Sequence, residues 1–422
     1  MSVNKICIVT SNYISGTPRV VKEADALLQA GYDVRVVFSQ GNIELNRLYD
    51  KNLLAEKSWS YSSFGWSSSR DQEKRLYYFS GIRHFIARNL PRTISKFRRI
   101  AETGHGRVYP ELARLAASEP ADLYIGHYPD GLAAAAYAAS RWGALLAYDF
   151  EDFHVGEGKN IKVQQRVEII EQRYLPRCMY LTAASPLMAD ALSKHYSIKR
   201  PIPIYNVFPW ADRETLDGKI KDRRGDALSI YWYSQTIGLD RGIQDAIQAA
   251  GLIDAPIQIH LRGALSEEVK RALLVLAAEC GVADRLYFHE RVSPTELLSR
   301  AVEHDIGLAT EQPVDTSRQI SVTNKLFFYL LAGLCVAATD VPGQRRLMDT
   351  IPDAGFLYPV GDHDALALQL KKFIDQPELL TRYKVGALYA AQTTWNWENE
   401  SQKLVEAVTT SLSKSSNKRS SR

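Results

Sequence analysis

The sequence predicts an α/β protein made of two domains in tandem, each with a parallel β-sheet flanked by helices. Its 422 residues are too many for one ordinary hydrophobic core, so two domains of about 200 residues are expected. Short apolar runs typical of buried strands alternate with amphipathic helical stretches from the start of the chain. A second series of this kind begins after a polar, charged segment at residues 206–227. Such alternation is typical of parallel sheets with crossover helices.

The first domain is predicted over residues 1–205. It opens with a βαβ unit, in which Pro18 lies in the first turn of the connecting helix and Gly31 ends that helix. An alanine-rich helix at residues 131–143 follows a later strand, and another helix starts at Pro186. The predicted strands are residues 5–11, 33–39, 121–127, 144–150 and 179–185.

The second domain is predicted over residues 228–390, after a linker at residues 206–227. Helical patterns separate its strands, and a C-terminal helix follows at residues 391–412. The serine-rich, basic residues 413–422 are predicted to be disordered. The predicted strands of this domain are residues 228–236, 256–263, 285–290, 306–310 and 335–339.

Composition excludes several classes of protein. The net charge of +4 is small for a nucleic-acid-binding surface. The four cysteines are widely spaced and form no CxxC pair, which argues against a zinc cluster or a disulfide framework and is typical of the reducing cytosol. No stretch approaches the roughly 18 apolar residues of a transmembrane helix. We therefore expect a cytoplasmic protein that does not bind nucleic acid.

Polar residues stand at the start of an apolar helix at residues 321–332. Ligands of parallel sheets bind beyond the carboxyl ends of the strands, where such helix starts lie. Helix amides and the helix dipole favour an anion there, and Lys325 in the first turn suits an occupied helix start better than an empty one. Ser321, Thr323 and Asn324 add polar groups. The alternative is ordinary capping by Ser321 or Thr323 with a solvated Lys325.

A second loop, at residues 234–244, has the features of a phosphate-binding turn. Gly238 bends the chain, and the pair Arg241 and Gly242 opens a helix, where an arginine can bind phosphate with two hydrogen bonds. Together with Lys325 this loop predicts a diphosphate clamp, and Arg262 with Gly263, after the next strand, would add a third donor. The alternative is a turn with an exposed arginine. Neither GxGxxG nor GxxxxGK[ST] occurs, which argues against a dinucleotide oxidoreductase and a P-loop NTPase.

A third cluster follows the strand at residues 144–150. Asp149, Glu151 and Asp152 lie within four residues of one another, and His127 ends the preceding strand. Acids in this place could orient an acceptor hydroxyl or take its proton. The alternatives are a metal site or an acidic surface loop, and a structural role for the histidine. The first strand is followed by a loop that ends in Gly16 and Thr17, which we assign as acceptor or loop contacts.

Residues 70–107 are rich in both basic and aromatic side chains. This composition predicts a peripheral contact with an anionic membrane surface. The alternative is a solvated helix face, and Pro91 interrupts any long helix there.

The run HDIGLATEQPVDTSRQISVTNKLFFYLLAGLCVAATDVPGQRRLM resembles the donor site of family 4 retaining glycosyltransferases, and YSQTIGLDRG resembles their donor loop. The resemblance extends over nearly the whole chain and includes the C-terminal helix, which in this family crosses back to the first domain. It implies the GT-B fold, two Rossmann-like domains facing a central cleft. It also implies transfer of a sugar from a nucleoside diphosphate sugar, without an obligatory metal or other cofactor. The donor contacts that it implies are Arg241, Arg262, Gly263, Thr323, Asn324 and Lys325.

The sequence departs from that family at two places. Phe328 stands where many members have a glutamate, with Ile320 eight residues earlier, and Thr236 replaces a usual arginine. Glu311 is the nearest upstream glutamate, and we expect it to contact the donor sugar. The implied acceptor is a cell-surface polysaccharide, such as lipopolysaccharide, or a lipid-linked glycan. Two alternatives are a nucleotide-sugar epimerase of the same fold and a donor-binding protein without turnover.

Overall fold

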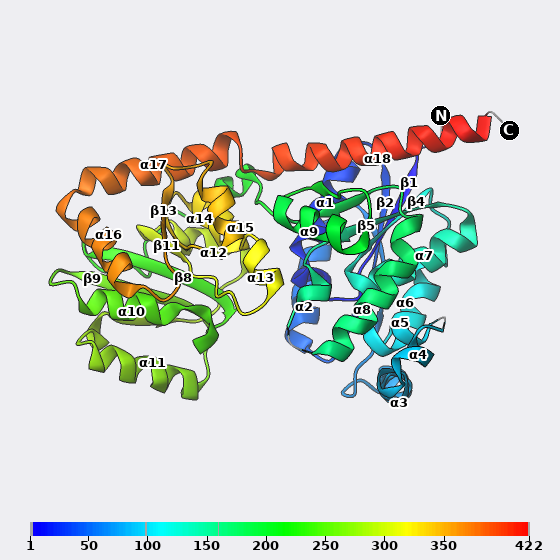
Figure 1. The fold of residues 1–422 in the computed structure, drawn as a ribbon, viewed down its shortest axis with the longest axis horizontal. Helices are drawn as coiled ribbons and strands as arrows, with labels where there is room; N and C mark the ends of the chain where they lie inside the picture. The colour runs from blue at the N-terminus through cyan, green and yellow to red at the C-terminus, as the bar shows by residue number, and fades with distance from the viewer. Residues whose placement is uncertain (1–2, 98, 159, 421–422) are drawn as a thin grey trace. The chain divides into compact units, whose positions relative to one another are not determined.

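The computed structural model describes residues 3–97, 99–158 and 160–420 (Figure 1). The chain divides into two compact units. The first contains the residues up to Tyr205 together with those from Ser401 onward, and the second is Asn206–Glu400. Each unit has its own parallel sheet with helices packed on it, so the predicted α/β fold class is confirmed.

The sheet of the first unit has seven strands in the order β3-β2-β1-β4-β5-β6-β7, and every pair is parallel. Sequential strands run outward from β1 in one direction and from β4 in the other, so the strand order reverses between β1 and β4. In such sheets ligands bind outside the carboxyl ends of the strands at this point of reversal. The strands are β1 (Lys5–Val9), β2 (Asp33–Gln40), β3 (Ser60–Gly65), β4 (Leu123–His127), β5 (Leu145–Phe150), β6 (Leu181–Ala183) and β7 (Ile202–Pro203).

The helices of the first unit cover the sheet through small and aliphatic side chains. Alanines of α7 are fully buried, and a Cβ on Gly126 of β4 would lie 2.5 Å from the Cα atom of Leu132, so the helix approaches the strand closely. Gly143 ends α7 with φ 64°, a conformation that suits glycine. The helices are α1 (Pro18–Gln29), α2 (Glu44–Leu54), α3 (Asp71–Asn89), α4 (Arg92–Ser95), α5 (Ile100–His105), α6 (Tyr109–Ala116), α7 (Tyr128–Trp142), α8 (Ile161–Tyr174) and α9 (Pro186–Tyr196).

The sheet of the second unit has six parallel strands in the order β10-β9-β8-β11-β12-β13. This order has the same form as in the first unit, and its point of reversal lies between β8 and β11. The strands are β8 (Leu228–Thr236), β9 (Ile257–Ala264), β10 (Leu286–His289), β11 (Ile306–Ala309), β12 (Cys335–Thr339) and β13 (Gly355–Tyr358).

The helices of the second unit surround a core of aliphatic residues on β8, β9 and β11. α14 lies against β11 so closely that a Cβ on Gly307 would overlap the ring of Tyr329. The helices are α10 (Ile243–Gly251), α11 (Glu267–Glu279), α12 (Pro294–Ala301), α13 (Thr316–Ile320), α14 (Asn324–Ala332), α15 (Pro342–Met348), α16 (His363–Asp375) and α17 (Pro377–Thr393).

The segment at residues 206–227, expected as a linker, packs on the second unit. Asp217 accepts a hydrogen bond from Arg300 at 2.6 Å, and Arg223 donates to Asp305 at 2.9 Å. These buried arginine and aspartate partners explain why a segment without strong helix or strand patterns is nevertheless ordered.

The last helix, α18 (Trp397–Ser420), joins the second unit to the final part of the first. Within the first unit, the hydroxyl groups of Tyr32 and Thr409 lie 2.7 Å apart. The helix continues to Ser420, through most of the segment expected to be disordered, and residues 397–420 contain neither glycine nor proline. Residues 421–422 lie outside the described residues.

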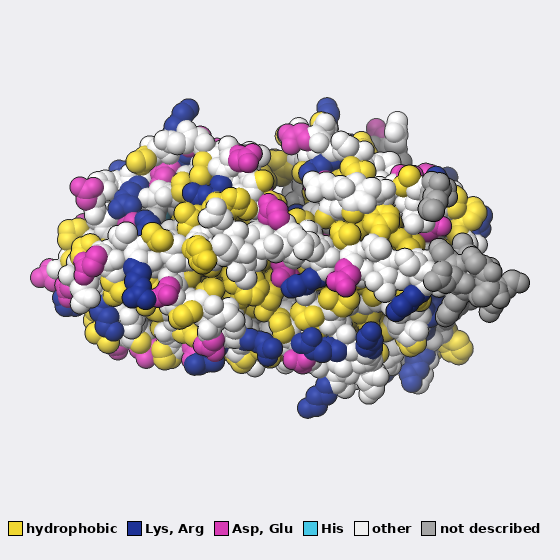
Figure 2. Space-filling view, turned by 90° about the horizontal axis from the view of Figure 1, so that it is seen from above, with side chains coloured by type: hydrophobic (Ala, Val, Ile, Leu, Met, Phe, Trp, Pro, Cys, Tyr) yellow, Lys and Arg dark blue, Asp and Glu magenta, His cyan; other side chains and the backbone are white. Residues whose placement is uncertain are grey.

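Among the helices of the described residues, none combines the length and the apolar character that a membrane span requires. On the face of the molecule shown in Figure 2, lysine and arginine side chains are scattered among aspartates and glutamates.

Candidate functional site

The start of α14 lacks the groups that normally satisfy a helix N-terminus. Thr323 is the N-cap residue but makes no side-chain hydrogen bond to the helix amides, and the first turn contains no acidic residue. Asn324 and Lys325 are the first two helical residues. Since free amides and the helix dipole both favour negative charge, this helix start is electrostatically suited to an anion.

Three cationic side chains gather at this helix start. The Nζ atom of Lys325 lies 5.4 Å from the centroid of the Trp232 ring, and the lysine side chain is only 16% exposed. Burial lowers the pKa of Lys325 below its usual value; Glu311 opposes this effect, and the charges of Arg241 and Arg318 add to it. The three cations repel one another, so a bound anion would stabilise all of them.

Two acidic side chains, Glu311 and Asp240, lie near these cations but beyond the usual hydrogen-bond distance. The Glu311 Oε1 atom lies 3.8 Å from the Lys325 Nζ atom. Asp240 lies 3.5 Å from the Arg241 Nε atom and 3.9 Å from a terminal nitrogen of Arg318. These separations exceed those of hydrogen bonds, so the three cations keep donors for a ligand.

Two buried polar atoms near the start of α14, one of Arg241 and one of Ser321, have no hydrogen-bond partner. Arg241 ends the short 3₁₀ helix η5 (Leu239–Arg241), which Gly238 precedes, and its Nε atom has no hydrogen-bond acceptor. Ser321 lies between α13 and α14, and its hydroxyl is also unpartnered. Unsatisfied buried groups of this kind are uncommon in proteins, and a bound ligand is one of their causes.

Side-chain hydrogen bonds connect the strand ends that carry this site. The Thr310 hydroxyl donates to the carbonyl of Arg241 at 2.5 Å, and the Thr339 hydroxyl donates to the carbonyl of Glu311 at 2.8 Å. The Gln344 amide donates to the carbonyl of Thr339 at 2.8 Å. The loops after β8, β11 and β12 are therefore held together at the point where the strand order reverses.

Two glycines of the predicted site are required by their surroundings. Gly242 has φ 68°, and an added Cβ would lie 2.3 Å from the Gln312 Nε2 atom and 2.9 Å from the carbonyl oxygen of Thr310. A Cβ on Gly263 would lie 2.6 Å from the carbonyl oxygen of Ser234. No other residue type fits either position without movement of the backbone.

Arg262 is engaged away from the cations at Lys325. Its guanidinium forms an ion pair with Asp222 and donates to the carbonyl of Glu290 at 2.5 Å. The side chain is 5% exposed. Arg262 was expected to add a third donor beside Arg241. In the structure its side chain instead links the segment at residues 206–227 to β9 and to the end of β10.

Phe328 is part of an aromatic cluster. Its ring centroid lies 5.3 Å from that of Phe208 and 4.6 Å from that of Tyr233, and the residue is buried. The position at which the family resemblance implies a carboxylate is thus filled by apolar packing. The acid closest to Lys325 is Glu311.

In the first unit, Arg19 and Asp149 form a fully buried ion pair. Arg19 donates to both carboxylate oxygens of Asp149, at 2.9 and 2.6 Å, and to the carbonyl of Ile204 at 2.8 Å. The Thr182 hydroxyl donates to Asp149 at 2.6 Å. Burial alone would raise the pKa of Asp149, but Arg19 and His127 hold it at about 2. Asp149 therefore positions Arg19. This role differs from the expectation that Asp149 contacts an acceptor hydroxyl.

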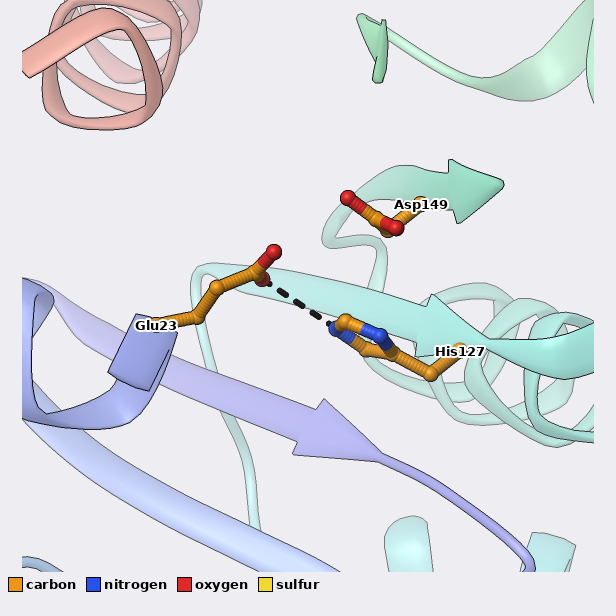
Figure 3. A group of neighbouring side chains, drawn as sticks. All are labelled: Glu23, His127 and Asp149. Carbon is orange, nitrogen blue, oxygen red and sulfur yellow. Dashed lines mark hydrogen bonds and ion pairs between the residues drawn. The ribbon is translucent and has the colours of Figure 1, made fainter. Parts of the chain in front are cut away.

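His127 contacts two carboxylates, those of Glu23 and Glu151, and Figure 3 shows the contact with Glu23. Its Nε2 atom is 3.1 Å from Glu23 and its Nδ1 atom is 2.9 Å from Glu151. Burial by itself would lower the pKa of His127, but the two glutamates raise it to about 10. A neutral imidazole has only one N–H group, so two carboxylate acceptors favour the charged ring. His127 is a buried cation that holds Glu151, and this arrangement does not suit a general base.

Glu151 is the member of this network nearest to solvent. Its side chain is 11% exposed, and it accepts a hydrogen bond from the Tyr128 hydroxyl at 3.2 Å. Tyr128 has φ 62°, which is costly for a residue other than glycine and often marks a functional site. Asp152 is half-buried beside it, and burial together with the charges of Glu151 and Asp152 raises the pKa of Tyr128. Glu151 and Asp152 are the carboxylates that a substrate can reach.

Glu23, His127 and Asp149 place potential metal-ligand atoms within 4.8 Å of one another. The guanidinium of Arg19 already lies among them, 3.5 Å from Glu23 and hydrogen-bonded to Asp149. A metal-bound histidine must be neutral, whereas the contacts of His127 with two carboxylates favour its protonated ring. A divalent cation would also be repelled by Arg19, so these residues fit a metal ion poorly.

Gly16 and Thr17 have different surroundings. Gly16 is exposed at the end of the 3₁₀ helix η1 (Ile14–Gly16), and an added Cβ would meet open space. Thr17 is buried, and its hydroxyl donates to the carbonyls of Tyr13 and Ile14 at 3.2 Å each. Only Gly16 is therefore accessible to an acceptor.

Sequence reasoning missed four residues of these sites. Arg19 and Glu23 lie four positions apart on the first helix, a spacing typical of an ion pair on one helix face, and this pattern was available from the sequence. Arg318 lies in the short helix α13, within a polar stretch of sequence, and Trp232 lies in β8, an apolar strand that is typical of a core. Neither of these two has a local pattern that would have revealed its position.

The chain matches no sequence profile of a protein family and no curated protein. Solved structures match it over nearly its whole length. HepE of Anabaena in complex with UDP-glucose has a TM-score of 0.67 at 14% identity, covering 96% of this chain and 99% of that one. Sucrose-phosphate synthase of Thermosynechococcus elongatus has a TM-score of 0.67 at 14% identity, covering 96% and 98%. A candidate UDP-N-acetylglucosamine 2-epimerase of Listeria monocytogenes has a TM-score of 0.57 at 11% identity, covering 97% and 96%.

These likenesses and the two parallel sheets establish the GT-B fold for this chain. At such low identity they establish the fold alone, and the activity has to be argued from the residues of the site.

Proposed function

We propose that this protein is a glycosyltransferase that uses a nucleoside diphosphate sugar and retains the configuration of the transferred sugar. The observation that carries the proposal is the start of α14, where Arg241, Arg318 and Lys325 surround a helix N-terminus without a side-chain cap. Such a cluster at the point of strand reversal suits a diphosphate. HepE, which shares the fold, is known in complex with UDP and glucose and with UDP-glucose.

In this proposal the second unit binds the donor. The amides near Thr323 and Asn324 and the side chains of Arg241 and Lys325 contact the diphosphate, and the Ser321 hydroxyl gains the acceptor that it lacks. Glu311 turns from Lys325 to a hydroxyl of the donor sugar. The loop around Gly242 and Gly263 approaches the nucleotide.

The reaction breaks the bond between the anomeric carbon and the β-phosphate oxygen. The acceptor oxygen attacks on the face that the phosphate leaves, and the acceptor proton passes to the departing phosphate oxygen. Arg241, Arg318 and Lys325 stabilise the charge that develops on the diphosphate, an effect that acts more strongly in the transition state than in the bound substrate. Because these three cations supply positive charge, we expect turnover to persist in the presence of a metal chelator.

We assign acceptor binding to the first unit, where Glu151 and Asp152 would orient the acceptor hydroxyl. His127 fixes the position of Glu151 through its 2.9 Å contact. The acceptor class is a polysaccharide or a lipid-linked glycan, and Gly16 is the accessible part of the loop after β1.

The test is incubation of the purified protein with a panel of nucleoside diphosphate sugars, with and without a bacterial lipid extract, following the melting temperature and nucleotide release. We expect one donor to raise the melting temperature and to be consumed. Arg241→Ala and Lys325→Ala should each weaken donor binding about 10- to 100-fold, because a charge-assisted hydrogen bond contributes about 1.5–3 kcal/mol. Lys371→Ala, which removes an exposed lysine of α16, is the matched control. Wild-type binding in both site variants would overturn the diphosphate assignment.

Two other functions have a specific observation in their favour. An epimerase is suggested by the Listeria structure of the same fold, and it would convert the donor into another nucleotide sugar without an acceptor. A donor-binding protein without turnover is suggested by the apolar surroundings of Phe328, and it would show the melting shift without nucleotide release. Product analysis by mass spectrometry separates all three.

A further inference from the structure

α3 presents its large apolar side chains to the outside of the first unit. The exposed side chains and their exposed fractions are Tyr78 61%, Phe79 63%, Ile82 63%, Phe85 59% and Ile86 57%. Their spacing of three and four residues places them on one stripe of the helix. In a globular protein such a stripe normally faces the core, so its exposure needs a partner to explain it.

The inward face of α3 is made of small and polar residues. Ser80 and Ala87 are buried, and the Nδ1 atom of His84 lies 2.8 Å from the carbonyl oxygen of Thr103 in α5. A Cβ on Gly104 of α5 would lie 3.1 Å from the carbonyl group of Ala87, so the two helices pack at close range. Figure 1 shows α3 at the edge of the unit, beside α4 and α5. This packing leaves no room for the apolar stripe to turn inward.

The same segment is strongly basic. Residues 75–99 contain seven lysines and arginines and no acidic residue, whereas the rest of the chain has 45 basic and 48 acidic residues, a net charge of −3. The guanidinium of Arg83 lies 5.6 Å from the ring centroid of Phe79, and that of Arg88 lies 5.3 Å from the centroid of Phe85. Positive charge and apolar surface are thus interleaved along one helix.

Exposed apolar and cationic side chains continue just beyond the end of α3. Ile94 and Phe97 are exposed, and Lys96 stands between them as a further exposed cation. The apolar stripe of α3 together with residues 92–97 is called the α3 surface below.

We propose that the α3 surface docks on an anionic lipid bilayer, with its aromatic and aliphatic side chains at the boundary between headgroups and acyl chains. Interfacial helices combine an apolar stripe with lysines and arginines that pair with lipid phosphates. Residues 75–99 contain no acid, although Glu111 pairs with Arg83 and Glu168 with Arg92. Arg75 and Lys96 are exposed and form no ion pair within the described residues, so their charges favour an anionic partner. The inference stands apart from the proposed transferase activity.

The test is co-sedimentation of the full chain with vesicles of phosphatidylcholine alone and of phosphatidylcholine with phosphatidylglycerol. We expect binding only to the vesicles that contain phosphatidylglycerol, with a marked loss at high salt. The basic variant Arg75→Ser/Lys96→Ser should weaken binding about 25-fold, because each cation near an anionic surface contributes about fivefold. The apolar variant Phe79→Ser/Phe85→Ser should weaken it at least about tenfold.

Val385→Ser/Tyr389→Ser is the matched control. Both residues are exposed on α17, at 63% and 66%, and they lie outside the first unit. Binding that is equal for neutral and anionic vesicles, or that the control variant loses as much as the apolar variant, would refute the proposal. So would concentration-dependent self-association of the wild type that only the apolar variant abolishes, because the occupant would then be a second copy of the chain. No nucleotide sugar is present, so failure here says nothing about the donor site.

Discussion

At the scale of single residues, Lys325 places a positive charge at a helix N-terminus, where the helix dipole disfavours it. It lies in the first turn of α14 and is largely buried against Trp232. Its nearest acid, Glu311, is too far for a hydrogen bond at 3.8 Å. Burial lowers the pKa of Lys325, so the empty site is destabilised relative to one that holds an anion. Because the position of Lys325 lowers the stability of the fold, ligand binding explains this residue better than folding stability does.

Glu311→Gln tests whether Glu311 and a diphosphate compete for Lys325. The amide has the same shape but no charge, so Lys325 would lose the counter-charge of Glu311 and bind an anion more readily. We expect the variant to bind a plain nucleoside diphosphate a few-fold more tightly than the wild type, and to turn over the sugar donor at least about tenfold more slowly. Calorimetric titration measures the first and nucleotide release the second. Weaker binding of the plain diphosphate would show that Glu311 supports the clamp instead of competing with it.

Phe328→Glu tests whether the missing family carboxylate can simply be restored. The new charge would lie among the rings of Phe208 and Tyr233. We expect the free energy of unfolding of the second unit to fall by about 3–5 kcal/mol, with no gain in activity. Phe328→Leu, which keeps the site apolar, should cost about 1 kcal/mol. Urea denaturation checks both, and a stable Phe328→Glu variant with faster turnover would restore the family assignment at this position.

At the scale of elements, both candidate sites arise where the strand order reverses. In the first unit His127 ends β4, next to β1, and in the second unit the loops after β8 and β11 carry Arg241 and Glu311. The carboxyl ends of neighbouring parallel strands bring loops together that are far apart in the chain. One example is the close contact between Gly242, in the loop after β8, and Thr310, at the end of β11.

Gly242→Ala is expected to disrupt the donor site while the unit stays folded. The added Cβ would lie 2.3 Å from Gln312 and 2.9 Å from the Thr310 carbonyl, so the Arg241 loop must move. We expect donor affinity to fall at least about tenfold. Gly361→Ala is the matched control, since its φ of 78° carries a similar backbone cost while its Cβ would meet open space. Equal donor affinity in the two variants would show that the Gly242 contact has no part in the site.

At the scale of the whole molecule, the buried histidines with the largest pKa shifts differ in direction between the two units. In the first unit, neighbouring carboxylates outweigh burial and raise the pKa of His127 to about 10 and that of His154 to about 9. In the second unit, burial lowers the pKa of His260 to about 3 and that of His304 to about 2. Protonated His127 and His154 therefore stabilise the first unit. His260 and His304 of the second unit, like His84 and His105 of the first, have a lowered pKa and favour the neutral form.

Raising the pH from about 6.5 to 9 should destabilise the first unit, because folded His127 and His154 hold protons that the unfolded chain releases above its ordinary histidine pKa of about 6.5. Lowering the pH from about 6.5 to 4 should destabilise the second unit, because the unfolded chain takes up protons that folded His260 and His304 do not bind. Calorimetry over this pH range measures both melting temperatures. His127→Gln should remove part of the alkaline loss in the first unit, and an unchanged slope in that variant would contradict the assignment of charge to His127.

Much of the fold could be predicted from local patterns. β8 was predicted over residues 228–236 and has those bounds, because a strand buried on both faces reads as a continuous apolar run. β3 was missed, because its residues SYSSFG form a partly exposed edge strand without such a run. The helix through residues 413–420 was missed because its polar composition is equally typical of disorder.

The candidate sites were less predictable than the sheets. The cluster at Ser321 to Lys325 was visible because a lysine at a helix start breaks a local rule. Arg318 and Trp232 follow no such rule, and their place beside Lys325 depends on how α13, β8 and the start of α14 pack together. Arg262 has the same local surroundings as a donor residue, but its ion pair with Asp222 assigns it to structure.

The sequence alone determined the two α/β units, most of their strands and the unusual lysine at the start of α14, since periodicity, composition and capping act over a few neighbouring residues. Only the tertiary structure decided which charges meet. Asp149 reaches Arg19 across 130 residues, and His127 reaches Glu23 across 104. The energy of a charge pair depends on its separation in space and on its burial, and neither quantity is contained in separation along the chain. For that reason Asp149 and His127 looked like exposed reagents in the sequence but are buried members of one hydrogen-bonded network in the folded protein.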